Sequence, residues 1–422
     1  MSELSYLEKL LDGVKVEWKT LEKVLKRTKG TKITAGQMKA LHKDNAPLKI
    51  FAGGKTVAFV DFKDIPEKDI NREPSIIVKS RGIIEFEYYD KPFSHKNEMW
   101  SYHSNNDAIS IKYIYYFLKI NEGYFQKIGG KMQMPQIATP DTDKFEVPIP
   151  CPDNPEKSLA IQSEIVRILD KFSALTAELT AELSMRKKQY NYYRDQLLSF
   201  DEEQEKPIYL EKLLDGVEVE WRTLGEIAVI YDGTHKTPKY TASGVPFVSV
   251  QNIKNLYGTN KYISPEDFKT YKNKPRKHDL FMTRIGDVGT CAIVEDDRPL
   301  AYYVTLALIR INQQIAVPGF IRYLIESRFG KAELYKRTLI HAVPMKINLG
   351  EIGKVAVPIP CPDNPEKSLA IQSEIVRILD KFDTLTNSIT EGLPREIELR
   401  QKQYEYYRDL LFSFPKPETV SN

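Results

Sequence analysis

The sequence predicts an α+β protein in which two globular modules are joined by two long, paired helices. Residues 147–172 and 357–382 carry the same 26 letters, VPIPCPDNPEKSLAIQSEIVRILDKF. The long stretches in front of the two copies do not resemble one another. Each copy opens a run in which apolar residues alternate at spacings of four and three, the pattern of a helix that pairs with another helix. We therefore expect two different modules on two equivalent helices.

The composition is that of a globular protein that folds in water. At 422 residues the chain is long enough for two or three hydrophobic cores. Cys151, Cys291 and Cys361 are too few and too odd in number for a disulfide framework, which favours a reducing compartment. No apolar run approaches the ~18 residues of a membrane span, and the start, MSELSYLEKL, shows no signal-peptide pattern. We expect a cytoplasmic protein without a membrane contact.

The net charge of +3 is unevenly distributed. Residues 19–150 hold 22 basic and 16 acidic side chains, and residues 222–360 hold 20 and 12, so the remainder is net acidic. Basic modules suit a polyanion such as DNA, whereas acidic helices suit contacts with proteins or with water. A bias of this size also occurs in proteins that bind no nucleic acid, so it supports DNA binding without establishing it.

Five parts are expected along the chain. They are an N-terminal helix with the first module (1–150), the first spacer helix (151–200), a linker with the second module (201–360), the second spacer helix (361–414) and a tail (415–422). The two halves open alike, with LEKLLDGVKVEW from Leu7 and LEKLLDGVEVEW from Leu210. Each opening should be a short amphipathic helix that Asp-Gly ends. We expect Trp18 and Trp221 to anchor hydrophobic cores.

The first module should be a small irregular sheet with helices. Strand-like runs occupy 48–60 and 75–89, and the apolar run at 111–120 has the length of a buried helix. The GGKT inside the first run lacks the earlier glycine of a phosphate loop, because Lys49 stands there, so we expect no nucleotide site. PDTDK at 140–144 lacks the spacing of a nuclease site and is interpreted as a turn.

The first spacer helix should begin at Asn154-Pro155, with Asn154 as N-cap, and run to about Phe200. Roughly 45 helical residues span roughly 65–70 Å. A lone helix would expose its apolar seam, so we expect the two identical seams to pair; the alternative is that each helix packs on its own module. The predicted seam residues are Ile161, Ile165, Ile168, Phe172, Leu175, Leu179, Ile371, Ile375, Ile378, Phe382, Leu385 and Ile389.

The middle parts of the two spacer helices differ. TAELTAEL at 176–183 repeats a tetrapeptide, and each copy adds about 6 Å and about 40° of rotation to a helix. The second helix has a longer segment there, in which Gly392 and Pro394 predict a break or kink. The motif QYNYYRD at 189–195 then recurs as QYEYYRD at 403–409. The two helices are alike without being interchangeable.

After an acidic linker at 201–207, the second module carries two loops suited to nucleic acid. YDGTHKTPKYTASG, from Tyr231, combines hydroxyls, His235 and lysines, which suit hydrogen bonds to phosphates and base edges. TRIGDVGT places Arg284 on a turn with glycines, and Arg81 in KSRG is expected at the corresponding place of the first module. Either arginine could instead hold loop carbonyls as a structural residue, and His235 could cap its loop.

Together these features resemble the specificity (S) subunit of a bacterial type I restriction–modification system across nearly the whole chain. The family pattern of Ile-Pro-x-Pro, then Gln, then Ile-x-x-Ile-Leu-Asp is matched from Ile149 to Asp170 and again from Ile359 to Asp380. The DGTH-x-TP and TRIG motifs of the second module are also typical of this family. The first module departs from the pattern, because it lacks DGTH and shows only its Gly-Gly and SRG features.

The resemblance implies that each module is a target recognition domain for one half of a split DNA site. The helices would form an antiparallel coiled coil that sets the spacer and docks two methyltransferase (M) subunits. Those subunits would use S-adenosylmethionine, and two restriction (R) subunits would use ATP with Mg²⁺. The chain itself would be non-catalytic and hold no cofactor or metal, and it lacks an Asn/Asp-Pro-Pro-Tyr/Phe methyltransferase motif. The alternative is a scaffold protein whose basic modules bind proteins or RNA.

The candidate DNA-binding residues are basic and hydroxyl side chains of the loops described above. They would meet phosphates or base edges of double-stranded DNA. They are Lys55, Lys79, Ser80, Arg81, Thr234, His235, Lys236, Thr237, Lys239 and Arg284.

Overall fold

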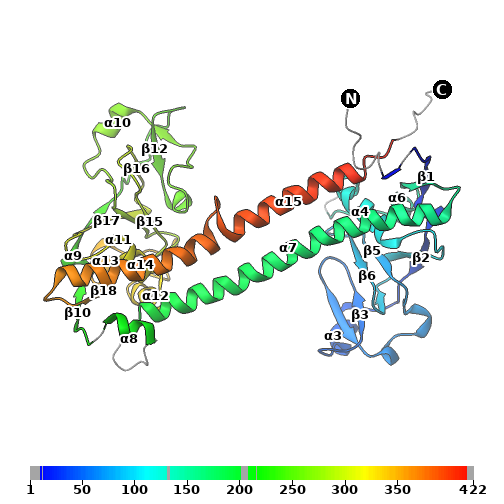
Figure 1. The fold of residues 1–422 in the computed structure, drawn as a ribbon, viewed down its shortest axis with the longest axis horizontal. Helices are drawn as coiled ribbons and strands as arrows, with labels where there is room; N and C mark the ends of the chain where they lie inside the picture. Colours follow the sequence, from blue (N-terminus) through cyan, green and yellow to red (C-terminus); the bar gives the residue numbers. More distant parts are fainter. Residues whose placement is uncertain (1–9, 12, 131–133, 201–207, 215, 416–422) are drawn as a thin grey trace. The chain divides into compact units, whose positions relative to one another are not determined.

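A computed structural model describes residues 10–11, 13–130, 134–200, 208–214 and 216–415. The chain divides into two compact units, Met1–Leu179 with Ile397–Asn422 (unit 1) and Thr180–Glu396 (unit 2). Each unit contains one module and parts of both spacer helices (Figure 1). The predicted acidic linker, the start of the N-terminal helix and most of the tail lie outside the described residues.

Unit 1 is an α+β module, as predicted. Its strands are β1 (Val16–Thr20), β2 (Lys26–Lys29), β3 (Leu48–Phe51), β4 (Val57–Val60), β5 (Ser75–Lys79), β6 (Glu85–Tyr89), β7 (Phe93–His95), β8 (Trp100–His103) and β9 (Glu146–Pro150). Its shorter helices are α2 (Leu21–Val24), α3 (Ala35–Leu41), α4 (Ile111–Ile120), α5 (Glu122–Gly129) and α6 (Thr139–Asp143), with 3₁₀ turns η1 (Phe62–Asp64) and η2 (Glu67–Asp69). The strands form sheets of order β2-β8-β5-β6 and β4-β3-β7 and the pair β1-β9.

The strand runs at 48–60 and 75–89 are confirmed as the hairpins β3-β4 and β5-β6, and the run at 111–120 is the helix α4. Ser110 starts α4 because its hydroxyl accepts a hydrogen bond from the Tyr113 amide. The interpretation of PDTDK as a turn is wrong for its first four residues, which belong to the short helix α6, whereas Lys144 is the C-cap of that helix. The buried Thr142 hydroxyl, which bonds both Trp100 and Tyr102, fixes α6 against β8.

Unit 2 repeats this architecture with other side chains. Its strands are β10 (Val219–Thr223), β11 (Ala228–Asp232), β12 (Val245–Val248), β13 (Tyr262–Ile263), β14 (Leu280–Thr283), β15 (Cys291–Ile293), β16 (Ala301–Tyr302), β17 (Leu306–Ile311) and β18 (Ala356–Pro360). Its shorter helices are α8 (Ile208–Leu214), α9 (Leu224–Ile227), α10 (Pro265–Lys269), α11 (Pro318–Glu326), α12 (Arg328–Tyr335) and α13 (Leu349–Gly353), with the 3₁₀ turn η3 (Val250–Asn252).

The strand orders of unit 2 are β11-β17-β14-β15, β13-β12-β16 and β10-β18, which match those of unit 1 element for element. In each unit the middle strand of the three-stranded sheet runs parallel to one neighbour and antiparallel to the other. The two modules differ in sequence but share one topology. Each strand of one module therefore has a structural counterpart in the other.

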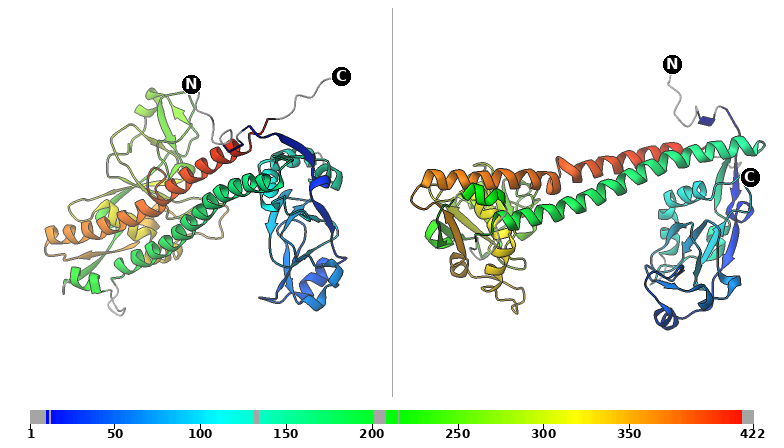
Figure 2. Two further views of the ribbon diagram at one scale, coloured as in Figure 1. Left: turned by 45° about the vertical axis from the view of Figure 1, so that its right-hand side comes forward. Right: turned by 60° about the horizontal axis from the view of Figure 1, so that its bottom comes forward.

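The spacer helices are α7 (Pro155–Leu197), α14 (Pro365–Asn387) and α15 (Gly392–Leu411), and Figure 2 shows the interruption between the last two. The predicted N-cap is confirmed, because Asn154 Oδ1 accepts from the Lys157 amide at 3.0 Å. The predicted break at Gly392 is confirmed as well, so 361–414 is not one helix. Gly392 has a φ of +76°, and a Cβ there would lie 2.4 Å from the carbonyl oxygen of Thr384, so only glycine fits.

The prediction that the two identical seams pair with each other is wrong. Ile161 and Ile165 are buried in the core of unit 1, and Ile371 and Ile375 are buried in the core of unit 2. The first turns of each spacer helix therefore pack on their own module, because that module offers a continuous apolar surface. The seam positions Leu175 and Ile389 are exposed instead, and Ile389 lies beyond the end of α14.

The spacer helices do pair, through the predicted seam residues Phe172 and Phe382, which meet tyrosines of the opposite helix. In unit 1 the Phe172 ring of α7 stacks on Tyr407 of α15, with centroids 5.4 Å apart and planes 24° apart. In unit 2 the Phe382 ring of α14 stacks on Tyr193 of α7 at 5.4 Å and 25°. Each pair of stacked rings joins the end of one repeated segment to the YYRD motif of the opposite helix. That pattern is the one an antiparallel coiled coil requires.

The two tryptophans have different environments. Trp18 is half-buried, meets Phe117 edge-on at 5.8 Å, and donates to the carbonyl oxygen of Pro415, so it anchors the core as predicted. Trp221 is 45% exposed, so its prediction as a core anchor is wrong. It rests against Phe329 on the surface of unit 2.

Candidate nucleic-acid interface

The loop after β11 in unit 2 presents most of its predicted DNA-binding residues to solvent. His235, Lys236, Thr237 and Lys239 are exposed, and Thr234 is half-buried. Thr234 shapes the turn, because its hydroxyl donates to the Lys236 carbonyl (3.2 Å) and accepts from the Lys236 amide (3.3 Å). This arrangement leaves the lysine side chains available for phosphates.

Arg284 lies underneath this loop and is buried. Its Nε donates to the Val304 carbonyl (3.0 Å) and its Nη1 to the Ile347 carbonyl (3.2 Å), while Nη2 lies 3.4 Å from the Asp232 carboxylate. The other oxygen of Asp232 contacts His235 Nε2 at 2.8 Å. Arg284 thus has the structural role that the sequence left open. Arg284 holds the Asp232 carboxylate in place, and Asp232 in turn orients His235 at the surface. His235 therefore has the loop-capping position that the sequence left open.

The predicted residues of unit 1 do not form one surface. Lys55 is exposed in the β3-β4 turn, and Arg81 is exposed after β5. Lys79 is buried and paired with Glu85 (2.5 Å) and Glu87 (2.8 Å). Burial opposes the charge, but these two hydrogen bonds raise the pKa of Lys79 above its ordinary value. Ser80 is buried too and donates to the Glu98 carbonyl (2.6 Å), so Lys79 and Ser80 are positioned to support the sheet.

The predicted correspondence between Arg81 and Arg284 is wrong. The Ile137 amide donates to the Ser80 carbonyl (3.0 Å) as the Ile347 amide donates to the Arg284 carbonyl (3.0 Å). Arg284 therefore corresponds to Ser80. Arg81 corresponds to Ile285, since these two residues form the equivalent bridges to Gln136 and Lys346. The sequence comparison missed this because the two modules differ by one residue in this region.

Unit 1 does have a counterpart of the DGTH loop, which the sequence analysis missed. The Thr31 amide donates to the His95 carbonyl (2.7 Å) as the Thr234 amide donates to the Tyr302 carbonyl (3.2 Å). Both threonines follow a glycine, Gly30 or Gly233, at which a Cβ would lie within 2.5 Å of backbone atoms. The offset between the two LEKLLDG segments also relates Gly30 to Gly233, so this signal was present in the sequence.

The side chain of His95 helps to hold this loop. It is fully buried, with Nδ1 3.2 Å from the Lys96 carbonyl and Nε2 3.1 Å from Ser101 Oγ. Burial lowers the pKa of His95 to about 4. The imidazole is therefore neutral at neutral pH and adds no positive charge to the surface above it.

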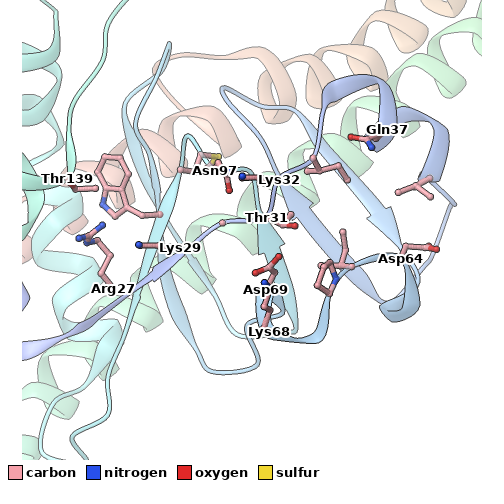
Figure 3. A pocket seen from close by; sticks show the side chains of 17 residues that line it. Arg27, Lys29, Thr31, Lys32, Gln37, Asp64, Lys68, Asp69, Asn97 and Thr139 are labelled. Atoms are coloured by element: carbon pink, nitrogen blue, oxygen red, sulfur yellow. The ribbon is translucent and has the colours of Figure 1, made fainter.

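The Gly30-Thr31 loop borders a groove of about 820 Å³ in unit 1, shown in Figure 3. Arg27, Lys29, Lys32 and Lys68 line it, together with Asp64, Asp69, Gln37, Asn97 and Trp100. Arg27 is paired with Asp143 at 3.3 Å. Among the described residues no carboxylate forms an ion pair with Lys29, Lys32 or Lys68, all of which are exposed. The groove thus offers free cations beside amide side chains, which suits a nucleic acid backbone and its bases.

Within the part of the chain that the structure describes, no group of three His, Cys, Asp or Glu side chains could hold a metal ion. Nor does any described helix combine the length and the apolar character of a membrane span.

Comparisons with known proteins cover nearly the whole chain. The model of a family described as "Type I restriction modification DNA specificity domain" matches residues 15–185 and 216–399. The EcoR124I/EcoR124II specificity subunit of Escherichia coli is 41% identical, with all of both chains covered. The EcoprrI specificity subunit of Escherichia coli is 36% identical over 93% of each chain. The S subunit from M. genitalium matches the fold with a TM-score of 0.60 at 15% identity, covering 96% of this chain and 98% of its own.

Proposed function

The chain belongs to the family of type I restriction–modification specificity subunits, so it is a non-catalytic DNA-recognition subunit, and we propose that units 1 and 2 each read one half of a split DNA target. One observation carries this proposal. Both units place a Gly-Thr loop at the same point of the same topology, yet surround it with different side chains. A shared scaffold with different surface residues is what two different half-sites require.

Within this proposal the two parts of recognition fall to different side chains. In unit 1, Lys29, Lys32 and Lys68 meet phosphates, while Gln37, whose Oε1 caps α3 by accepting from Thr34, keeps its amide nitrogen to donate to base edges. In unit 2, Lys236 and Lys239 meet phosphates beside His235 and Thr237. Among the residues predicted from sequence, Lys55 and Arg81 remain candidates for DNA contact because they are exposed. The buried Lys79, Ser80 and Arg284 position the strands and loops instead.

The spacer helices are proposed to dock two methyltransferase subunits. Because the repeated segment occurs twice, each copy presents the same exposed residues to solvent, such as Arg167 and Lys171 on α7 and Arg377 and Lys381 on α14. Equivalent surfaces suit two copies of one partner. S-adenosylmethionine would be bound by those partners, and ATP with Mg²⁺ by two restriction subunits that join them. The complex would act in the cytoplasm.

Methylation sequencing of cells that carry this chain with its methyltransferase partner tests the function. We expect adenine methylation at a target of two short defined sequences separated by an unspecified spacer, and its loss when this chain is deleted. The purified chain with S-adenosylmethionine alone should methylate nothing. Methyl transfer by the isolated chain, or a complex that prefers RNA to duplex DNA, would contradict the proposal.

A further inference from the structure

The loop that follows α12 in unit 2 displays an unusual amount of apolar surface. Val343 is 99% exposed, and Leu339, Ile340 and Met345 are exposed around it. Single exposed apolar residues are common on protein surfaces, but a contiguous group at the tip of one loop marks a binding site. The loop, residues 338–346, has no role in the function described above.

This loop is held in a defined shape. The Leu339 amide donates to the Lys346 carbonyl (2.8 Å), which closes the loop at its base, and the Ala342 amide donates to the Leu339 carbonyl (3.2 Å). On the other side the Gly286 amide donates to the Met345 carbonyl (2.8 Å). Val343 therefore projects from a supported base, so its exposure is a feature of the fold.

The loop is tied to the candidate DNA interface through Arg284. The guanidinium bonds the Ile347 carbonyl, at the end of loop 338–346, and contacts Asp232, at the start of the DGTH loop. Both loops thus contact one buried side chain, Arg284, at their ends. This shared anchor connects the tip to the surface that we assign to DNA.

The charges near the loop favour a polyanion over an apolar protein partner. Lys346 is exposed and forms no ion pair with any carboxylate among the described residues. Lys236 and Lys239 are exposed on the neighbouring DGTH loop. In complexes with DNA, apolar side chains enter between base pairs or contact base edges while nearby lysines meet phosphates.

Unit 1 has a related feature at the equivalent position. The Gly82 amide donates to the Pro135 carbonyl (2.9 Å), as Gly286 does to Met345. The neighbouring Met134 is 53% exposed, and its sulfur lies 3.1 Å from Nε of the exposed Arg81. An apolar side chain with an adjacent cation therefore occurs in both units, with different residues in each, as expected of an element that contributes to specificity.

We propose that loop 338–346 is an apolar wedge that contacts the base pairs of the half-site read by unit 2, with Val343 entering the base stack and Lys346 meeting a neighbouring phosphate. The proposal rests on the function given above, since it needs unit 2 to bind duplex DNA. It adds a contact to the bases themselves that the lysines of the DGTH loop do not provide.

The test uses the full chain purified with its methyltransferase subunits and a synthetic duplex that carries the target found by methylation sequencing. 2-Aminopurine, which fluoresces when unstacked, replaces single adenines in the half-site of unit 2. The wild-type complex should raise the fluorescence at one base step. Val343→Ser should abolish that rise and weaken binding about tenfold, equivalent to about 1.4 kcal/mol. Val229→Ser, at another exposed valine of unit 2, is the matched control and should change neither.

Two results would overturn the wedge. One is a Val343→Ser complex that unstacks and binds the duplex like the wild type. The other is a Val343→Ser chain that no longer copurifies with the methyltransferase subunits but keeps its DNA affinity when they are added back, which would assign the tip to a protein contact. Failure of the proposed function looks different, because the wild-type complex itself would then show no preference for the mapped duplex.

Discussion

The buried glutamine of each repeated segment connects a spacer helix to its module, and its replacement gives a sharp test of this connection. In unit 1 the Gln162 side chain is fully buried on α7. Its Oε1 accepts from the Ser110 amide (2.9 Å), at the start of α4, and its Nε2 donates to the Ala108 carbonyl (3.0 Å) and to Ser158 Oγ (3.0 Å). Gln162→Met keeps the length of the side chain and removes every hydrogen bond.

The size of the effect follows from the groups that lose a partner. The Ser110 amide and the Ala108 carbonyl would remain in a partly buried site without a hydrogen bond, which costs roughly 1–3 kcal/mol for each such group. Because both groups are only partly buried, we use the lower end of that range and expect unit 1 to lose about 2 kcal/mol. For a unit of this size that loss lowers the unfolding temperature by about 4–8 °C.

Scanning calorimetry of the full chain measures this change, and amide hydrogen exchange locates it, since protection of the Ser110 amide should fall. Gln372→Met is the equivalent change in unit 2, where Gln372 Oε1 accepts from the Val317 amide (2.9 Å). Gln401→Met is the control, because Gln401 is exposed on α15 and a surface change stays within about 0.5 kcal/mol. If Gln162→Met shifts the transition no more than Gln401→Met does, this account of the connection is refuted.

Three further predictions concern length, charge and pH. A third TAEL copy beside residues 176–183 lengthens α7 by about 6 Å. The unspecified spacer of the DNA target should therefore grow by about one to two base pairs, at about 3.4 Å each. An unchanged spacer in methylation sequencing would refute a rigid helix. Lys29→Gln and Lys32→Gln should each reduce the slope of the logarithm of the DNA-binding constant against the logarithm of the salt concentration by about 0.9. Lys127→Gln, outside the groove, is the control and should leave this slope unchanged. Equal slopes for all three variants would disprove the contact between the groove and DNA. Because the pKa of His95 is about 4 in the folded protein and ~6.5 when unfolded, the unfolded state binds the extra proton between these values. Unit 1 should keep its full stability above about pH 6.5 and lose up to about 3 kcal/mol as the pH falls to about 4. Thermal unfolding measured between about pH 4 and about pH 7 checks this, and a His95→Gln chain that loses the same stability over this range would contradict it.

Local chemistry in the sequence was enough to predict the elements with strong signals. The helix starts at Asn154 and Asn364, the break at Gly392 and the hairpin at 48–60 all depend on capping, on glycine geometry or on short apolar runs. Each of these signals acts between residues that are close in the chain. The same is true of the family motifs in α7 and α14, which identified the protein's class before any coordinate was known.

The candidate interface could be predicted only in part, because its geometry depends on contacts between distant residues. Whether a lysine or arginine faces solvent is decided by its partners across the sheet. Lys79 meets Glu85 and Glu87 on the adjacent strand, and Arg284 reaches carbonyls of residues 304 and 347. By contrast, Lys236 in the DGTH loop forms no ion pair among the described residues, and its side chain is exposed.

The sequence by itself determined that two unlike modules are joined to two equivalent helices, since a letter-for-letter repeat and its heptad pattern are visible without coordinates. Only the tertiary structure decided that the two modules share one topology and that Ser80, rather than Arg81, corresponds to Arg284. It also decided that the first turns of each seam pack on their own module, whereas the seam residues Phe172 and Phe382 stack on tyrosines of the opposite helix. The physical reason is that a fold depends on which positions are buried, and many different side chains satisfy the same burial pattern.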